Sequence, residues 1–162
     1  MSMRSGPVVI GFDGSPASER ALREAGDLLA ARTALVVVVW EAGLAFGALE
    51  LPTSSVGLPP APIDVRAALE IEDAMYERAQ RLAQHGADLA KQAGLEAEAL
   101  AVADEVTVPE TLARVAQERD AQALVVGTRG HGGLGKVLLG GTAEGVIRKA
   151  PCPVLVVRAP AP

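Results

Sequence analysis

The fold class is decided by the stretch Val8-Val9-Ile10-Gly11-Phe12-Asp13-Gly14-Ser15-Pro16, in which a strand runs directly into the start of a helix. Its first five residues form a short, continuous apolar run, which is typical of a strand buried on both faces of a sheet. Ser15 can cap a helix with its hydroxyl, and Pro16 suits the first helical position because its missing N–H would be unpaired there anyway. An amphipathic helix then follows, with apolar residues at helical spacing and charged residues between them.

The same alternation continues along the chain. Further strands are predicted at residues 35–40, 95–102, 121–126 and 154–157, and further helices at about 66–92, from 109 onward and at 142–149. Strands that alternate with helices favour a parallel sheet with helices on both faces, joined by right-handed crossovers. We therefore expect one α/β domain over residues 1–162, built in three layers, α/β/α, around a five-stranded parallel sheet. Such sheets bind ligands at the carboxyl ends of the strands where the strand order reverses, and this point is expected between the first and fourth strands.

The long helix and two irregular segments complete the predicted organisation. The helix carries an apolar stripe that is expected to face the sheet, formed by Ile71, Met75, Ala79, Leu82, Gly86, Leu89 and Ala93. Gly86 marks either close packing against the sheet or a weak point in the helix. Residues 42–65 are rich in glycine and proline and are predicted to form a long surface loop, and residues 159–162 a disordered tail.

Composition narrows the class of protein. Hydrophobic residues make up 49% of the 162 residues but aromatic residues only 2%, so the core is expected to consist of Val, Leu, Ile and Ala. The net charge is −5 and no basic run stands out, so no nucleic-acid partner is expected. The single cysteine, Cys152, allows no internal disulfide, which fits a reducing compartment. The apolar run at residues 8–12 is too short for a membrane span, so we expect a cytoplasmic protein without membrane association.

A glycine-rich segment follows the fourth predicted strand. It reads Gly127-Thr-Arg-Gly-His-Gly-Gly-Leu-Gly-Lys-Val-Leu-Leu-Gly-Gly141, with seven glycines in fifteen residues. Glycine allows positive φ and lets a ligand approach the backbone amides closely. Successive backbone N–H groups and the N-terminus of a following helix attract phosphate oxygens. We therefore interpret the segment as a phosphate-binding loop; the alternative is a loop without function.

Two well-known phosphate motifs match this segment poorly. Gly130-His-Gly-Gly-Leu-Gly135 matches GxGxxG, but it follows the fourth strand, and residues 150–158 lack the acidic residue that dinucleotide binding needs. Residues 130–137 nearly match a P-loop, but Val137 stands where a Ser or Thr should hold magnesium. A P-loop ATPase is therefore disfavoured, although Lys136 could still meet a phosphate.

A third pattern covers most of the chain. Gly127-Thr-Arg-Gly130, nine further residues to Gly140, a short helix and the segment Ala150-Pro-Cys-Pro-Val-Leu-Val-Val157 resemble the universal stress protein family, and so does the opening stretch from Val9 to Ser15. The resemblance runs from about residue 7 to 158 and leaves only residues 42–65 poorly matched. It implies the Rossmann-like, adenine nucleotide alpha hydrolase-like fold with strand order 3-2-1-4-5. It also implies homodimers formed through the last strand, Val154–Val157, whose apolar edge would invite pairing with another chain.

The resemblance further implies a nucleotide site. Gly127, Gly130 and Gly140 match the three glycines of the motif found in the ATP-binding branch of the family. Asp13 matches the acidic residue at the end of the first strand, which in the family lies near the nucleotide. The backbone around Val39 matches the second-strand position that meets adenine.

The chain departs from this motif at Gly141, where the family has a Ser or Thr whose hydroxyl reaches a phosphate. We interpret this position as the N-cap of the following helix, with Glu144 completing a capping box. Glycine is a tolerable N-cap, so the fold should survive. The lost hydrogen bond is worth about 1.5–3 kcal/mol, or roughly tenfold to a hundredfold in affinity. Thr142 is a candidate for a substitute hydroxyl, and the backbone N–H groups of both residues remain.

The other polar candidates carry weaker signals. Asp13 is either a turn-forming residue or a ligand, for Mg²⁺ among others, although one carboxylate is a weak metal signal. Arg129 lies inside the glycine-rich segment and is a candidate phosphate contact. His85 and His131 form no metal-binding pair in the sequence. Cys152 lies between two prolines and is expected to be a packed small residue rather than a nucleophile.

These patterns support a stress-response regulatory protein that binds ATP as the first hypothesis. It would be at most a very slow ATPase, because no general base or arginine finger is identifiable. One alternative is a cyclic AMP-binding protein, since the change at Gly141 weakens a phosphate contact. Another is a dimeric interaction module that binds no nucleotide. The enzymatic alternative, a degenerate P-loop ATPase, would be distinguished by replacing Lys136.

Overall fold

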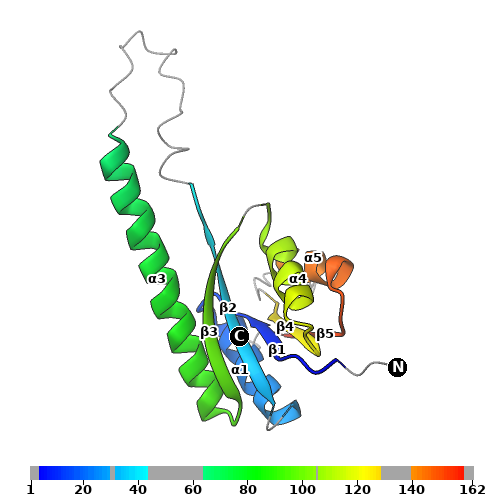
Figure 1. Cartoon of the computed structure of the whole chain (residues 1–162). Coiled ribbons are helices and arrows are strands. Elements are labelled where there is room, and N and C mark those ends of the chain that lie inside the picture. The colour runs from blue at the N-terminus through cyan, green and yellow to red at the C-terminus, as the bar shows by residue number, and fades with distance from the viewer. Residues whose placement is uncertain (1–3, 30–31, 44–63, 105, 129–139, 159–162) are drawn as a thin grey trace, which may run out of the picture.

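The protein forms one five-stranded parallel sheet (Figure 1). The computed structural model describes residues 4–29, 32–43, 64–104, 106–128 and 140–158. The strands, in chain order, are β1 (Val8–Gly11), β2 (Thr33–Glu41), β3 (Glu96–Asp104), β4 (Ala123–Gly127) and β5 (Val154–Val157). Their order across the sheet is β3-β2-β1-β4-β5, and all neighbouring pairs are parallel. The predicted fold class and strand order are therefore confirmed.

Four described helices cover the two faces of the sheet, which gives the predicted three layers. They are α1 (Pro16–Leu28), α3 (Val65–Gln92), α4 (Val108–Glu118) and α5 (Gly141–Lys149). Buried residues of α1 and α3 share one core cluster with one face of the strands. Buried residues of α4 and α5 share a second cluster with the opposite face. Figure 1 shows α3 and α4 on opposite sides of the sheet.

Strand alternation divides the core between these layers. Along β1, Val8 and Ile10 face the α1 and α3 side, whereas Val9 faces the α4 and α5 side. All three are fully buried, as the continuous apolar run predicts for a strand covered on both faces. Ile10 pairs with Val36 of β2 and Val125 of β4, so β1 lies at the centre of the sheet.

Helix α3 approaches the sheet closely because its contact face is built from small residues. A Cβ added at Gly86 would lie 2.7 Å from Phe12 Cδ1 and 2.8 Å from Val36 Cγ1. These separations are shorter than real Cβ contacts allow, so Gly86 is required by close packing and is not merely a weak point in the helix. Alanines continue this face at the sheet end of the helix: Ala79, Ala83, Ala87 and Ala90.

The first half of the predicted apolar stripe on α3 is not buried. Ile71 is 52% exposed, and the neighbouring apolar residues Val65 and Leu69 are exposed as well. The reason is length: a helix of 28 residues spans about 42 Å, whereas the nine residues of β2 span about 30 Å. Helix α3 therefore extends past the sheet, as Figure 1 shows, and its first turns have no strand beneath them.

The connection between β2 and α3 is described only at its two ends. At the β2 end, Gly43 N donates a hydrogen bond to Glu72 Oε1 at 2.9 Å. At the other end, Asp64 caps α3 by accepting from Ala67 N. Most of the predicted loop 42–65 and the predicted tail 159–162 lie outside the described residues.

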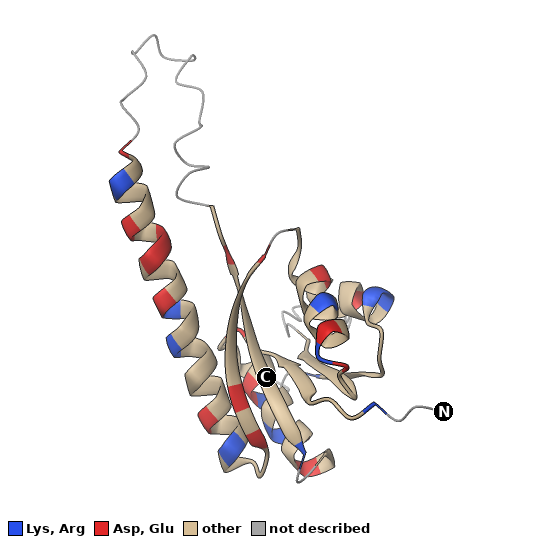
Figure 2. Cartoon of the chain, in the orientation of Figure 1, with Lys and Arg blue, Asp and Glu red and all other residues tan. Residues whose placement is uncertain are grey.

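Charged residues of both signs are interspersed along the described chain (Figure 2). On the helices several of them form exposed pairs one turn apart, such as Arg20 with Glu24 in α1 and Arg81 with Glu77 in α3. Exposed pairs of this kind contribute little stability. None of the helices in the described ranges is both long and apolar enough to cross a membrane.

Candidate functional site

The site is built where the strand order reverses. The chain leaves β1 through α1 and arrives at β2, whereas it leaves β4 in the direction of α5 and β5. Because β1 and β4 are hydrogen-bonded neighbours, these two exits diverge from adjacent strand ends. Such a point leaves a crevice at the carboxyl edge of a parallel sheet. The predicted juxtaposition of the first and fourth strand ends is therefore confirmed.

A hollow of about 250 Å³ lies at this edge, and residues 127 and 140–143 line it. Four of the predicted site residues, Gly127, Gly140, Gly141 and Thr142, thus come together. The fifth lining residue is the buried Ala143. The hollow is somewhat smaller than the roughly 300–1,000 Å³ of typical small-molecule pockets, and it has room for a phosphate group beside these residues.

The N-terminus of α5 opens onto this hollow without a side-chain cap. Its N-cap is Gly140, which makes no side-chain hydrogen bond. The other three described helices are capped by the side chains of Ser15, Asp64 and Thr107. The first N–H groups of a helix lack intrahelical acceptors, and the helix dipole adds partial positive charge at this end. An uncapped N-terminus at a hollow is therefore suited to an anion.

The position of this cap corrects the sequence interpretation. We expected the N-cap at residue 141, but α5 begins at Gly141 and the N-cap is Gly140. The expected capping box is absent as well, because the Glu144 carboxylate accepts a hydrogen bond from Arg148 at 2.7 Å instead. Among the residues that the structure describes, a Cβ added at Gly141 would meet no atom of a non-neighbouring residue within 4 Å, so a side chain at this position would have open space on the described side.

Gly127 is required by packing, independently of any ligand. A Cβ at this residue would lie 2.6 Å from both the backbone carbon and the backbone oxygen of Ala17 in α1. The absent side chain therefore lets the end of β4 lie directly against the first turn of α1. Sequence reasoning had assigned this glycine to the phosphate loop only.

Asp13 lies just beyond the end of β1, at the same edge of the sheet, and is exposed. Its Oδ1 accepts a hydrogen bond from Ser15 N at 2.9 Å, as the turn-forming alternative describes, whereas the favoured ligand role stays a prediction. The turn also contains Ser18, a 4% exposed residue that sequence reasoning missed. The available signal was its place three residues after Ser15, where the N-cap side chain accepts from its backbone N–H.

The other predicted site residues are placed less fully. Val39 lies near the carboxyl end of β2, paired with Val102 of β3, and packs partly buried on the α4 and α5 side of the sheet. Arg129 and Gly130 lie outside the described residues. Within the described ranges, no three His, Cys, Asp or Glu side chains gather as metal ligands.

A family model, the universal stress protein family, matches residues 5–158. The chain belongs to this family. The universal stress protein YxiE of Bacillus subtilis is 26% identical over 151 residues, which cover 93% of this chain and 97% of YxiE. Relatives from Methanocaldococcus jannaschii and Thermus aquaticus are 51% and 43% identical over 45 and 49 residues. Those two matches span only 26% and 36% of the relatives' own lengths.

Solved universal stress protein structures resemble this chain along nearly its whole length. One from Archaeoglobus fulgidus, in complex with dAMP, is 26% identical with a TM-score of 0.57, and the match covers 96% of this chain and 99% of that one. Another, in complex with cAMP, is 25% identical with a TM-score of 0.60, and the match covers 96% and 100%. Both likenesses extend over the strands and helices that form the hollow.

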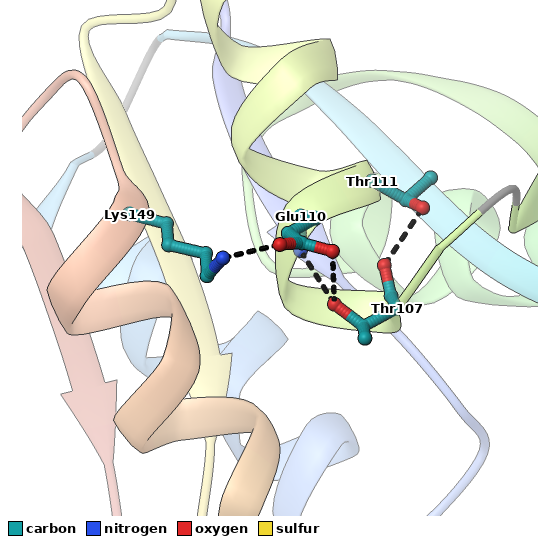
Figure 3. Close-up of polar contacts among 4 residues, drawn as sticks. All are labelled: Thr107, Glu110, Thr111 and Lys149. Carbon is teal, nitrogen blue, oxygen red and sulfur yellow. Dashed lines mark hydrogen bonds and ion pairs between the residues drawn. The ribbon is translucent and has the colours of Figure 1, made fainter.

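In this universal stress protein, α5 is held against α4 by packing and by charge. A Cβ at Gly145 would lie 2.6 Å from Pro109 Cγ, so the two helices touch closely. Glu110, in the first turn of α4, accepts hydrogen bonds from Lys149 and from the Thr107 hydroxyl (Figure 3). The Lys149 contact, followed by that of Thr107, holds the pKa of the Glu110 carboxyl below its ordinary value. These contacts fix the helix whose other end lines the hollow.

Proposed function

We propose that this universal stress protein binds an adenine nucleotide at the carboxyl edge of its sheet, with a phosphate group in the hollow at α5. The uncapped N-terminus of α5 carries the proposal, because it offers backbone N–H donors and partial positive charge where the strand order reverses. Support comes from relatives of the same fold whose structures are in complex with dAMP and cAMP. The ligand that we propose first is ATP, with Mg²⁺ as a candidate companion ion.

Most of the predicted residues have a direct role in this proposal. The amides of Gly141 and Thr142 would bind phosphate oxygens, and Gly140 would keep the approach free of side chains. Asp13 would face the ligand from the neighbouring strand end and is the candidate contact for Mg²⁺. The Val39 backbone would meet adenine. Gly130, which belongs to the motif, and Arg129, which precedes it in the glycine-rich segment, would contribute to the phosphate loop.

The proposed role is regulatory rather than enzymatic. All five residues that line the described hollow are glycine, threonine or alanine, and none of these side chains is a general base. We therefore propose a cytoplasmic stress-response protein that signals through its bound state, with at most very slow hydrolysis of ATP. A partner copy would pair along β5, an apolar strand at the sheet edge, to give a homodimer. Light scattering that finds a monomer at micromolar concentration would contradict the dimer.

Calorimetric titration with ATP, AMP and cyclic AMP, each with and without magnesium, tests the binding proposal. The sharpest variant is Gly141→Ser, which restores the hydroxyl that the family motif carries, at a position with open space. We expect it to tighten ATP binding roughly tenfold to a hundredfold, since a charge-assisted hydrogen bond contributes about 1.5–3 kcal/mol. Gly141→Ala is the matched control, because it adds the Cβ without the hydroxyl and should leave the affinity nearly unchanged. Absence of adenine-nucleotide binding in both the wild type and Gly141→Ser would refute the proposal.

Cyclic AMP is the second candidate ligand. Gly141 lacks the hydroxyl that would contact the phosphate chain of ATP, and cyclic AMP carries only a single phosphate. A related structure in complex with cAMP adds support. Binding of cyclic AMP without binding of ATP in the same titrations would favour this candidate. If none of the nucleotides binds, an interaction module without a nucleotide is favoured instead.

A further inference from the structure

Ser18 lies in the first turn of α1, next to the carboxyl edge of the sheet where the nucleotide site is proposed. It is 4% exposed. The end of β4 lies against this turn, because a Cβ at Gly127 would come within 3.0 Å of Ser18 N. Ser18 is therefore a buried polar residue between the two strand ends that form the proposed site.

The hydroxyl of Ser18 uses its full hydrogen-bonding capacity within this turn. It donates to the backbone oxygen of Ser15 at 3.0 Å. It accepts from Ser15 Oγ at 3.3 Å and, over a longer separation of 3.4 Å, from Asp13 N. One donated and two accepted hydrogen bonds are all that a hydroxyl can form.

Asp13 is held from two directions by the same network. Its backbone N–H points to Ser18 Oγ, and its Oδ1 accepts from Ser15 N at 2.9 Å. Ser15 is in turn bound to Ser18 through Oγ and through its backbone oxygen. Removing the Ser18 hydroxyl would break these three contacts. The Ser15 backbone oxygen and Oγ would keep the N–H groups of Glu19 and Ser18, but the turn that places the Asp13 carboxylate would be held less tightly.

We propose that Ser18 is a positioning residue of the nucleotide site: it sets the place of Asp13 relative to the end of β4. This inference rests on the proposed function. Ser18 itself does not touch the ligand; it acts through Asp13.

Helix α4 offers a matched control. Thr111 is 3% exposed, lies in the first turn of α4, and donates its hydroxyl to the backbone oxygen of the N-cap residue Thr107 at 2.8 Å (Figure 3). Its local chemistry therefore parallels that of Ser18, but α4 contributes no residue to the lining of the hollow. Loss of either hydroxyl should lower stability, and only loss of the Ser18 hydroxyl should lower nucleotide affinity.

The test compares Ser18→Ala with Thr111→Val, and combines Ser18→Ala with Asp13→Ala, by calorimetric titration with ATP, AMP and cyclic AMP. We expect Ser18→Ala to weaken binding of whichever of these nucleotides the wild type binds by about threefold to tenfold, and Thr111→Val to leave it within about twofold. In the Asp13→Ala background, the Ser18 substitution should cause little further loss, as for residues that act through one another. Unchanged affinity in Ser18→Ala, or an equal loss in both backgrounds, would overturn the proposal. Ser18→Cys, which opens no cavity, replaces Ser18→Ala if that variant does not fold.

A measurement without ligand separates this inference from the proposed function. In the unliganded protein, Ser18→Ala should speed hydrogen exchange at the Ser15 amide, the donor to Asp13, while the Thr111 amide exchanges as in the wild type. If the wild type binds none of these nucleotides, the proposed function fails, and this exchange rate alone decides whether Ser18 orders the turn. An unchanged Ser15 amide would overturn the positioning role.

Discussion

Two glycines that line the same hollow should respond in opposite ways to the same substitution. At Gly127, a new Cβ would lie 2.6 Å from the carbonyl carbon and oxygen of Ala17, which are helix backbone and cannot rotate away. At Gly141, a new Cβ would meet nothing within 4 Å. Neither residue has a positive φ, so alanine is conformationally acceptable at both. Only the space available to the methyl group differs.

The magnitude follows from two terms. Overpacking against a rigid neighbour costs about 1–3 kcal/mol. Replacing glycine by alanine also restricts the unfolded chain, which stabilises the folded state by about 0.4–1 kcal/mol where the conformation is compatible. The second term is common to both variants and cancels in their comparison. Gly127→Ala should therefore be about 1–3 kcal/mol less stable than Gly141→Ala, and Gly141→Ala should equal or slightly exceed the wild type.

Urea unfolding followed by the fluorescence of Trp40, the single tryptophan, measures this difference. The slope of the unfolding free energy against urea should be the same in both variants, because the exposed surface does not change. For a chain of 162 residues, the expected difference in Tm is about 2–12 °C, at roughly 2–4 °C per kcal/mol. Equal stability of the two variants would refute the argument that Gly127 is a packing residue.

Two further predictions concern ionisable side chains. The pKa of the Glu110 carboxyl is held below its ordinary value of 4.5 chiefly by Lys149. Lys149→Met should raise that pKa, which an NMR titration of Glu110 measures. The ion pair stabilises the folded state fully above the unfolded pKa of Glu110, and this stabilisation is lost as the pH falls through the lower folded pKa. The stabilities of the variant and the wild type should therefore converge in acid. Identical titration in both proteins would contradict this. Burial raises the pKa of the Cys152 thiol, so at neutral pH this thiol should react with a disulfide reagent more slowly in the folded protein than in the protein unfolded by urea. Equal reaction rates in the folded and unfolded protein would contradict the raised pKa.

Local patterns predicted the elements because each element has a local physical cause. The apolar runs around Ile10 and Val125 are typical of strands covered on both faces, and Ser15 followed by Pro16 favours the start of a helix. The alternation of these elements restricts the topology, so the adjacency of β1 and β4 could be expected from the sequence. The candidate site at that edge followed from the same reasoning.

Two predictions differ from the structure: the position of the apolar stripe of α3 relative to the sheet, and the residue that forms the N-cap of α5. The apolar stripe of α3 was expected to face the sheet, but Ile71 is exposed. Periodicity shows which face of a helix is apolar and not how far the sheet extends beneath it. The N-cap of α5 was placed one residue late. Flanking glycines offer no side chain to mark a helix start, so Gly140 and Gly141 could not be told apart by local chemistry.

The sequence by itself determined the parallel α/β architecture, the family and the place of the candidate site, because strand periodicity, helix caps and glycine spacing are local properties of the chain. Only the tertiary structure decided why particular residues stand in that site. Gly127 is glycine because the backbone of α1 lies against it, and Ser18 is buried because β4 covers it. Contacts of this kind join segments more than a hundred residues apart, and their closeness is set by how the layers pack rather than by any pattern within either segment.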